Sequence, residues 1–294
     1  MTDLTKGILA GLGTGMNWAA ISILVRSLSG TITPAGITAT RATVGGGIVF
    51  AVALAAGYGG EMVRMPLGVV LALWGAMIIA MGFGDTVFFA SMDHLGVTRA
   101  LTLSMANPLL TTLVGIGLLG EAVTLPRAIG ILLVVGGIIL IISGKGEGPA
   151  ERRGATRRGI RLVFLAAGAW ALAAVILKPV LQVVSVMAAT AVRIPAGGVF
   201  LWLTPWTRGT LGAVRGSTRA EQGHLAAICL LSAIGSLLFT TGIKYGGVAV
   251  GNVLSSTSPL FALPFEVWVL GQRPSRQTVA GAVVTVAGIG LMNF

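Results

Sequence analysis

The chain has 294 residues, of which 55% are hydrophobic and only 10% are charged, and its mean hydropathy is +0.93. A water-soluble domain carries about 25% charged residues because polar groups must cover its surface. This composition therefore excludes an ordinary soluble enzyme, a secreted domain and a disordered chain. The 44 glycines suit closely packed membrane helices, and the single cysteine, Cys229, permits no internal disulfide.

Ten apolar segments follow one another along the chain, each close to the roughly 20 residues that cross a bilayer. Turn sequences separate them, such as Ser29-Gly30 before Pro34 and Gly271 to Pro274. In chain order the segments cover residues 7–28, 34–57, 66–90, 97–119, 126–143, 159–181, 185–203, 224–244, 247–270 and 276–293. The sequence therefore predicts an all-α integral membrane protein with ten transmembrane helices.

The two halves of the chain are related by an internal repeat. A shift of 152 residues places Gly7 on Gly159, Trp18 on Trp170 and Arg41 on Arg193. A shift of 151 residues places Gly84 on Gly235, Pro108-Leu109 on Pro259-Leu260, Gly130 on Gly281 and Gly137 on Gly288. The offset between matching residues changes by only one residue over a whole half of the chain. Such regularity is hard to obtain by chance, so the repeat is the strongest signal in the sequence.

A polar, basic stretch near the midpoint divides the chain into a first repeat (1–143), a linker (144–158) and a second repeat (159–294). Each repeat holds an odd number of predicted helices, so the second repeat must enter the membrane from the opposite side. The sequence thus predicts two inverted five-helix repeats. Such repeats are typical of secondary transporters, whose binding site lies near the bilayer midplane between them.

The repeated motifs resemble those of the EamA-type branch of the drug/metabolite transporter superfamily. The first copy has Gly-x-x-Trp-Ala at 15–19, Ser-x-x-x-Pro-Leu at 104–109 and Leu-Gly-Glu at 119–121. The second copy keeps Trp-Ala at 170–171 and Ser-x-x-x-Pro-Leu at 255–260, but Gln272 replaces the acidic residue of the third motif. The resemblance spans nearly the whole chain. It implies ten helices around a central cavity, and export of amino acids and other small metabolites across the cell inner membrane.

Two arginines lie inside predicted helices, where a charge costs at least ~2.5 kcal/mol and needs a stabilising contact. Arg41 is about seven residues into its helix, roughly 10 Å deep at 1.5 Å per residue, and Asp85 lies at a similar depth in the next, oppositely directed helix. We expect an Arg41–Asp85 pair, acting either as a structural ion pair or as a substrate or proton site. Arg193 has Ser236 at the position that corresponds to Asp85. It either bonds backbone carbonyls or reaches across the interface to the other repeat, or else it offers its planar guanidinium to a substrate carboxylate.

The remaining candidate residues are aromatic or polar. Trp18, with the adjacent Asn17, and Trp170 occupy matched positions and either contact a ligand or pack within the bundle. Polar residues precede a proline in each repeat, and they either satisfy freed carbonyls or line a cavity. These are Ser104 and Asn107 before Pro108, and Ser255 and Ser258 before Pro259. Both prolines would bend their helices, and we assign them as candidate hinges.

The sequence carries no Gly-rich phosphate loop, no Ser/His/Asp arrangement and no paired catalytic carboxylates, and its two histidines are far apart. We therefore expect no enzyme activity, metal, cofactor or nucleic acid partner. The predicted function is secondary transport, by alternating access, of a small polar metabolite, with amino acids as the leading class and a proton as a candidate coupling ion. The alternatives are efflux of hydrophobic drugs or cations, and a structural or lipid-interacting membrane protein. The sequence leaves the oligomeric state open.

Overall fold

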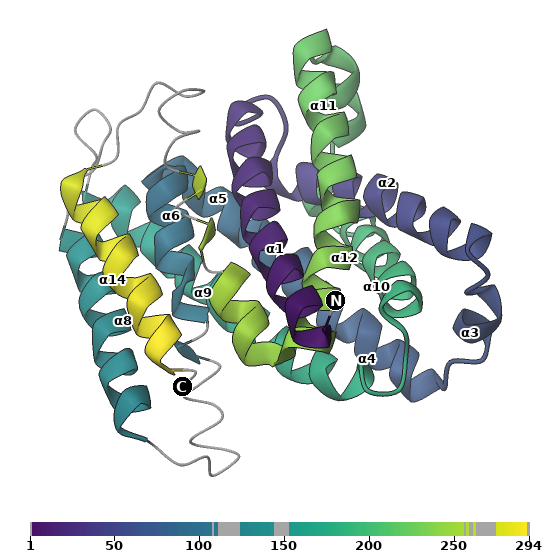
Figure 1. Ribbon diagram of the computed structural model, residues 1–294. Coiled ribbons are helices and arrows are strands. Elements are labelled where there is room, and N and C mark those ends of the chain that lie inside the picture. Colours follow the sequence, from purple (N-terminus) through teal and green to yellow (C-terminus); the bar gives the residue numbers. More distant parts are fainter. Residues whose placement is uncertain are drawn as a thin grey trace.

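The computed structural model describes residues 2–107, 109–110, 124–143, 153–255, 257–258, 261–262 and 275–292, and nearly all of them are helical (Figure 1). The described helices are α1 (Asp3–Ser27), α2 (Pro34–Ala55), α3 (Gly59–Val63), α4 (Leu67–Met77), the π-helix η1 (Ile78–Asp85), α5 (Thr86–Leu95), α6 (Val97–Ser104), α8 (Leu125–Ser143), α9 (Arg153–Val180), α10 (Val186–Trp202), the 3-10 helix η2 (Pro205–Thr207), α11 (Thr210–Gly216), α12 (Arg219–Ser255) and α14 (Arg276–Met292).

The helices begin where their sequences supply a cap. The side chains of Thr2, Thr33 and Ser185 accept a hydrogen bond from the first turn of α1, α2 and α10. Among the described residues, five helical stretches are long and apolar enough to cross a membrane, or six if the bent pair 186–202 and 205–216 is one span. The protein is therefore a helical, multi-span membrane protein.

The third predicted segment, 66–90, is not one regular α-helix. It consists of α4, the π-helical turns of η1 and then α5, which ends at Leu95. Gly82 and Gly84 lie in η1. A methyl group added to Gly82 would meet the side chain of Phe200 at 2.9 Å, and one added to Gly84 would meet that of Trp170 at 2.8 Å. π-helical turns are rare in proteins, and those that occur are often found at functional sites. This one ends on Asp85.

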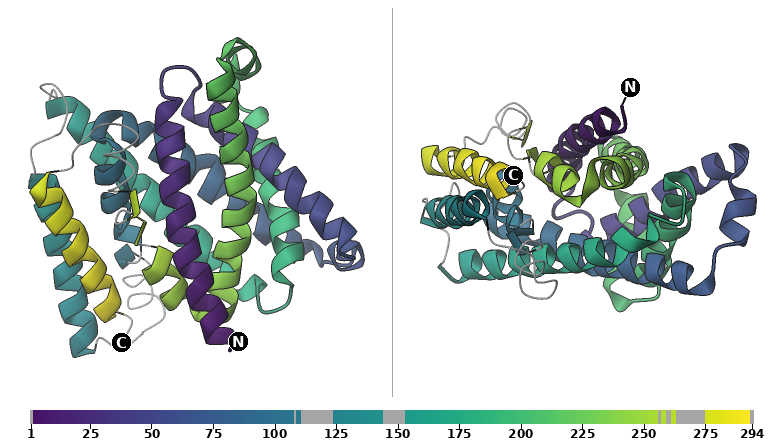
Figure 2. Two further views of the ribbon diagram at one scale, coloured as in Figure 1. Left: turned by 45° about the horizontal axis from the view of Figure 1, so that its top comes forward. Right: turned by 60° about the horizontal axis from the view of Figure 1, so that its bottom comes forward.

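The predicted boundary between segments 224–244 and 247–270 is also different in the structure. α12 runs through it from Arg219 to Ser255 as one helix, because no proline or capping residue interrupts the hydrogen bonds at Lys244-Tyr245-Gly246. Figure 1 and Figure 2 show its last turns leaving the line of the preceding helix. Most of the later parts of segments 97–119 and 247–270, with Pro108 and Pro259, lies outside the described residues.

Corresponding positions of the two repeats make corresponding contacts in space. A methyl group added to Gly46 would meet Ile194 and Pro195, and one added to Gly198 would meet Ala42 and Thr43. Both sets are related by the 152-residue shift. Two further pairs of contacts are related in the same way. Gly7 faces Gly246 as Gly159 faces Leu95. Gly137 faces Thr285 as Gly288 faces Val134. These contacts pair α1 with α12, α5 with α9, α2 with α10 and α8 with α14. Helices α8 and α14 lie side by side at one edge of the molecule (Figure 1).

Helices α1 and α9, which correspond in the repeat, run in opposite directions. α1 starts beside Gly246 and ends at Ser27, whose hydroxyl is 2.9 Å from Nδ1 of His224 at the start of α12. α9 packs near its start against Leu95, and the carbonyl of Val184 just after its end accepts a bond from Lys244. The N-terminal end of α1 and the C-terminal end of α14 lie at the same end of the bundle (Figure 2).

Candidate functional site

A cavity of about 200 Å³ lies between the two halves, lined by residues of α1, α2, α4, η1, α6, α9, α10 and α12. Every substrate-contacting residue predicted from the sequence lines it, apart from Ser255, whose side chain lies outside the described residues. These lining residues are Asn17, Trp18, Arg41, Asp85, Ser104, Asn107, Trp170, Arg193 and Ser258. Residues from distant parts of the sequence therefore converge on one chamber.

The expected pair between Arg41 and Asp85 is present. Nη2 of Arg41, on α2, forms an ion pair with Oδ2 of Asp85, at the end of η1. Nη1 of Arg41 donates a 3.1 Å hydrogen bond to the hydroxyl of Ser232 on α12. Arg41 is 2% exposed and Asp85 7% exposed. The pair is thus desolvated, and removing either member would leave an uncompensated buried charge.

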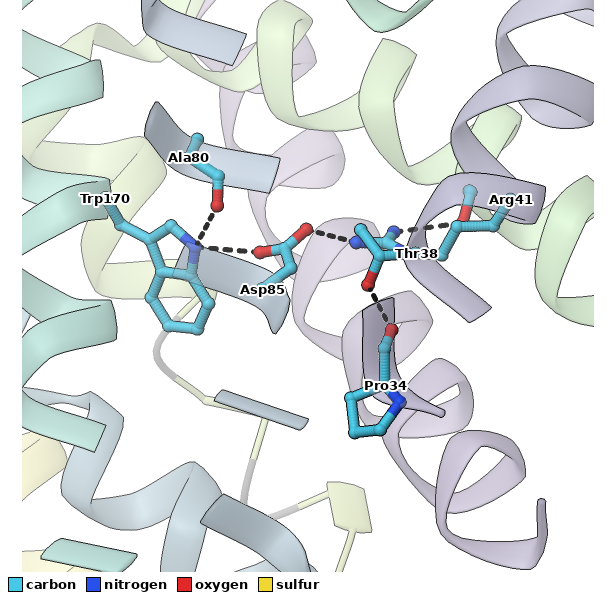
Figure 3. Close-up of polar contacts among 7 residues, drawn as sticks. Pro34, Thr38, Arg41, Ala80, Asp85 and Trp170 are labelled. Carbon is cyan, nitrogen blue, oxygen red and sulfur yellow. Dashed lines mark hydrogen bonds and ion pairs between the residues drawn. The ribbon is translucent and has the colours of Figure 1, made fainter. Parts of the chain in front are cut away.

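The second repeat also binds the acid of the first (Figure 3). Nε1 of Trp170, on α9, donates hydrogen bonds of 2.8 Å to Oδ1 of Asp85 and 3.1 Å to the carbonyl of Ala80. The adjacent Gly84 makes this approach possible, since a methyl group there would lie 2.8 Å from Nε1. Arg41, Asp85 and Trp170 therefore form a continuous polar chain across the interface between the repeats.

An aromatic cluster lies beside this chain. Trp18 stacks on Phe88 and Phe89 at 5.8 Å between ring centroids, and it meets the edge of Trp170 at 5.7 Å. The guanidinium carbon of Arg41 lies 5.7 Å from the centre of the Trp18 ring and 5.2 Å from that of Phe89. These distances fit cation–π attraction. Trp18 and Trp170 thus pack in the bundle and also line the cavity.

Arg193 has a different environment from its counterpart Arg41. Its Nη2 donates a 2.9 Å hydrogen bond to the hydroxyl of Thr240, and its guanidinium carbon lies 5.8 Å from the Phe239 ring centre. Arg193 is 5% exposed, and its Nε, like that of Arg41, has no hydrogen-bond acceptor within the described part of the chain. No carboxylate among those same residues forms an ion pair with it. The guanidinium thus lines the cavity as a buried charge with incomplete compensation.

The polar residues before the prolines are only partly defined. The hydroxyl of Ser104 donates to the carbonyl of Leu101, which is the local backbone contact expected of a serine near a helix break. Asn107 lines the cavity and makes a further polar contact, while Ser258 is 4% exposed. The candidate hinge residues Pro108 and Pro259 lie outside the described residues.

Sequence reasoning missed two polar residues that hold the arginines. Ser232 corresponds to Met81 and Thr240 to Phe89 under the 151-residue shift, so each hydroxyl stands where the other repeat has an apolar side chain. That difference between the repeats was the available signal. For the described residues, no group of three His, Cys, Asp or Glu side chains could hold a metal ion.

Comparisons with known proteins agree with this architecture. The model of the EamA-like transporter family matches residues 5–143 and 157–294. An uncharacterized transporter of Archaeoglobus fulgidus is 31% identical over 233 residues, which cover 76% of this chain and 78% of that protein. A protein of known crystal structure shares the fold, with a TM-score of 0.69 and 20% identity, over 98% of this chain and 96% of its own. The match of two copies of one transporter domain, at the two repeats read from the sequence, shows that the chain belongs to the EamA-like transporter family.

Proposed function

We propose that the protein exports small polar metabolites that carry a carboxylate, with amino acids as the leading class, across the cell inner membrane. Ten transmembrane helices would form two inverted five-helix repeats, the first over 1–143 and the second over 159–294. The cavity between them would be the substrate site. Its candidate contacts are the nine lining residues named above together with Ser255.

The observation that carries this proposal is the state of Arg193. It is a buried guanidinium that lines the cavity. The described residues give it one hydroxyl contact and no carboxylate within ion-pair distance, and the charge of Asp85 acts on it from farther away. Arg41, by contrast, is neutralised by Asp85. An incoming carboxylate would supply the bidentate, charge-assisted contact for which a guanidinium is well shaped. The serine, asparagine and tryptophan side chains of the cavity would orient the rest of the molecule.

Alternating access would follow from the reciprocal contacts of the two repeats. Since α1 packs on α12 as α9 packs on α5, exchanging the two packing arrangements would open the cavity to the other side. Asp85 connects Arg41 of its own repeat to Trp170 of the other, and so it is the candidate site for a coupling proton. Pro108 and Pro259 remain candidate hinges for the same motion.

Efflux of hydrophobic cations is the second candidate. Apolar side chains such as Met77, Met81 and Phe239 also line the cavity and favour it. The charges argue against it, because the described lining has two arginines and one aspartate, which is already paired. A cation would enter a cavity with an excess positive charge.

The experiment is transport by the purified protein in liposomes. Labelled neutral amino acids are loaded, and their release is compared with that from liposomes containing Arg193→Gln protein. Release that depends on the wild-type protein and is lost in the variant supports the proposal. Release of hydrophobic cations without release of any amino acid would overturn it in favour of drug efflux.

A further inference from the structure

The first repeat contains an occupied carboxylate site, formed by residues of both repeats. Its elements are the Arg41 guanidinium on α2, the Asp85 carboxylate on η1 and a donor from a third helix, the Trp170 indole N–H. Gly84, directly before the acid, lets that donor approach. Because the acid belongs to the chain, this site needs no substrate.

The second repeat repeats the arginine and the glycine of this arrangement, but not the acid, and Asn17, next to the Trp170 counterpart Trp18, takes the place of the indole donor. Arg193 on α10 corresponds to Arg41, and Ser236 on α12 corresponds to Asp85. Gly235, directly before Ser236, corresponds to Gly84. A methyl group added to Gly235 would lie 2.2 Å from Oδ1 of Asn17, so the Asn17 amide packs there much as the indole of Trp170 packs on Gly84.

The side chains of the second arrangement are available to a ligand. Arg193, Ser236 and Asn17 all line the cavity. Asn17 is only 9% exposed, and the described part of the chain gives its amide no hydrogen-bond acceptor or donor. Thr240, one turn after Ser236, accepts from Arg193 and donates to the Ser236 carbonyl, which holds the guanidinium beside this turn of α12. An amide, a hydroxyl and a guanidinium are three groups that can donate hydrogen bonds to one anion.

We infer that the substrate carboxylate takes the place in the second repeat that the Asp85 carboxylate takes in the first. Arg193, Ser236 and Asn17 would bind it, and Asp85 would be the internal counterpart of the substrate. The inference rests on the proposed function and deepens it. It names the position and the contacts of the recognised group. The substrate carboxylate would supply, beside Arg193, the acid that the chain itself supplies beside Arg41.

Placing an acid on the chain tests this directly. Ser236→Asp would pair with Arg193 and compete with the substrate, whereas Ser236→Asn has nearly the same size without the charge. The probe is the labelled amino acid that the wild-type protein transports best, together with its carboxamide. We expect Ser236→Asp to weaken binding of the acid at least about tenfold relative to Ser236→Asn, as for a lost charge-assisted contact. Binding of the carboxamide should differ much less between the two variants.

The exchange variant Asp85→Ser/Ser236→Asp extends the test. It moves the internal acid to the second repeat and leaves Arg41 for the substrate, so acid binding should recover relative to Ser236→Asp alone. Equal binding of the acid by Ser236→Asp and Ser236→Asn would overturn the inference while the proposed function stands. A wild-type protein that binds no amino acid would overturn both.

A third variant covers the case in which Ser236→Asp does not fold. Ser236→Cys, in a Cys229→Ala background, is purified first and then labelled with a sulfonate-bearing or a hydroxyl-bearing methanethiosulfonate. Only the anionic label should abolish binding of the acid. Equal effects of the two labels would contradict the inference, as would failure of either to react, because a substrate cavity must be reachable from one side of the membrane.

Discussion

Nε1 of Trp170 donates a 2.8 Å hydrogen bond to Oδ1 of Asp85, so the second repeat holds the acid of the first (Figure 3). The same carboxylate pairs with Arg41 through its other oxygen. One buried side chain thus connects α2, η1 and α9, and any movement of the repeats against each other must preserve or break this connection.

The Arg41–Asp85 pair should be important for stability. Asp85→Ala leaves a desolvated guanidinium and should lower the free energy of unfolding by about 3–5 kcal/mol. The double variant Arg41→Met/Asp85→Leu removes both charges and should be closer to the wild type. Thermal unfolding of purified protein in detergent, followed by tryptophan fluorescence, measures both effects. An Asp85→Ala protein that melts with the wild type would mean that the pair contributes nothing.

Substitutions of Arg193 should separate substrate recognition from packing. Arg193→Gln keeps hydrogen-bonding capacity and approximate length but removes the charge. It should weaken binding of carboxylate substrates by about 1.5–3 kcal/mol, with a much smaller effect on their amides. Arg193→Lys should also lose much of the affinity, because a point charge cannot supply the planar fork. Competition against transport of a labelled amino acid gives the affinities. Equal weakening for acid and amide would show that Arg193 serves only to hold the helices together.

Two glycines should resist enlargement because polar side chains of the other repeat approach them. A methyl group on Gly84 would lie 2.8 Å from Nε1 of Trp170, and one on Gly235 would lie 2.2 Å from Oδ1 of Asn17. Each alanine substitution should cost about 1–3 kcal/mol by overpacking, measured as a lower melting temperature. Gly75→Ala and Gly223→Ala are matched controls, since a methyl group at either meets nothing within 4 Å. If the four variants melt alike, the close approaches carry no energetic cost.

The orientation in the membrane can be predicted from charge. Most Lys and Arg outside Arg41 and Arg193 fall on the side of the predicted membrane topology that carries the 144–158 linker, including Arg152, Arg153 and Arg157. The positive-inside rule then places this linker in the cytoplasm and both termini outside. A reporter that fluoresces only in the cytoplasm, fused after Phe294, should stay dark. A bright signal would reverse the assignment, and the same reporter inserted in the linker is the positive control.

Much of the architecture could be predicted from the sequence because it depends on regular quantities. Helix length follows from bilayer thickness, and the rise of 1.5 Å per residue places Arg41 and Asp85 at similar depth in neighbouring helices. The repeat brought corresponding residues to notice, including the absence of an acid at Ser236. Helix boundaries were less accurate. α12 continues past Gly246, because glycine loosens a helix without removing its hydrogen-bond donors.

The contacts between the repeats were decided only by the tertiary structure. Nothing local in the sequence directs Trp170 to Asp85, Ser232 to Arg41 or Asn17 to Gly235. Each depends on how a helix is rotated about its own axis and where it crosses another helix. That rotation is set by many small packing contacts together, whereas apolarity on all sides of a membrane helix leaves it almost unspecified in the sequence. The sequence alone determined which residues are polar and at what depth they lie, and the packing decided which of them meet.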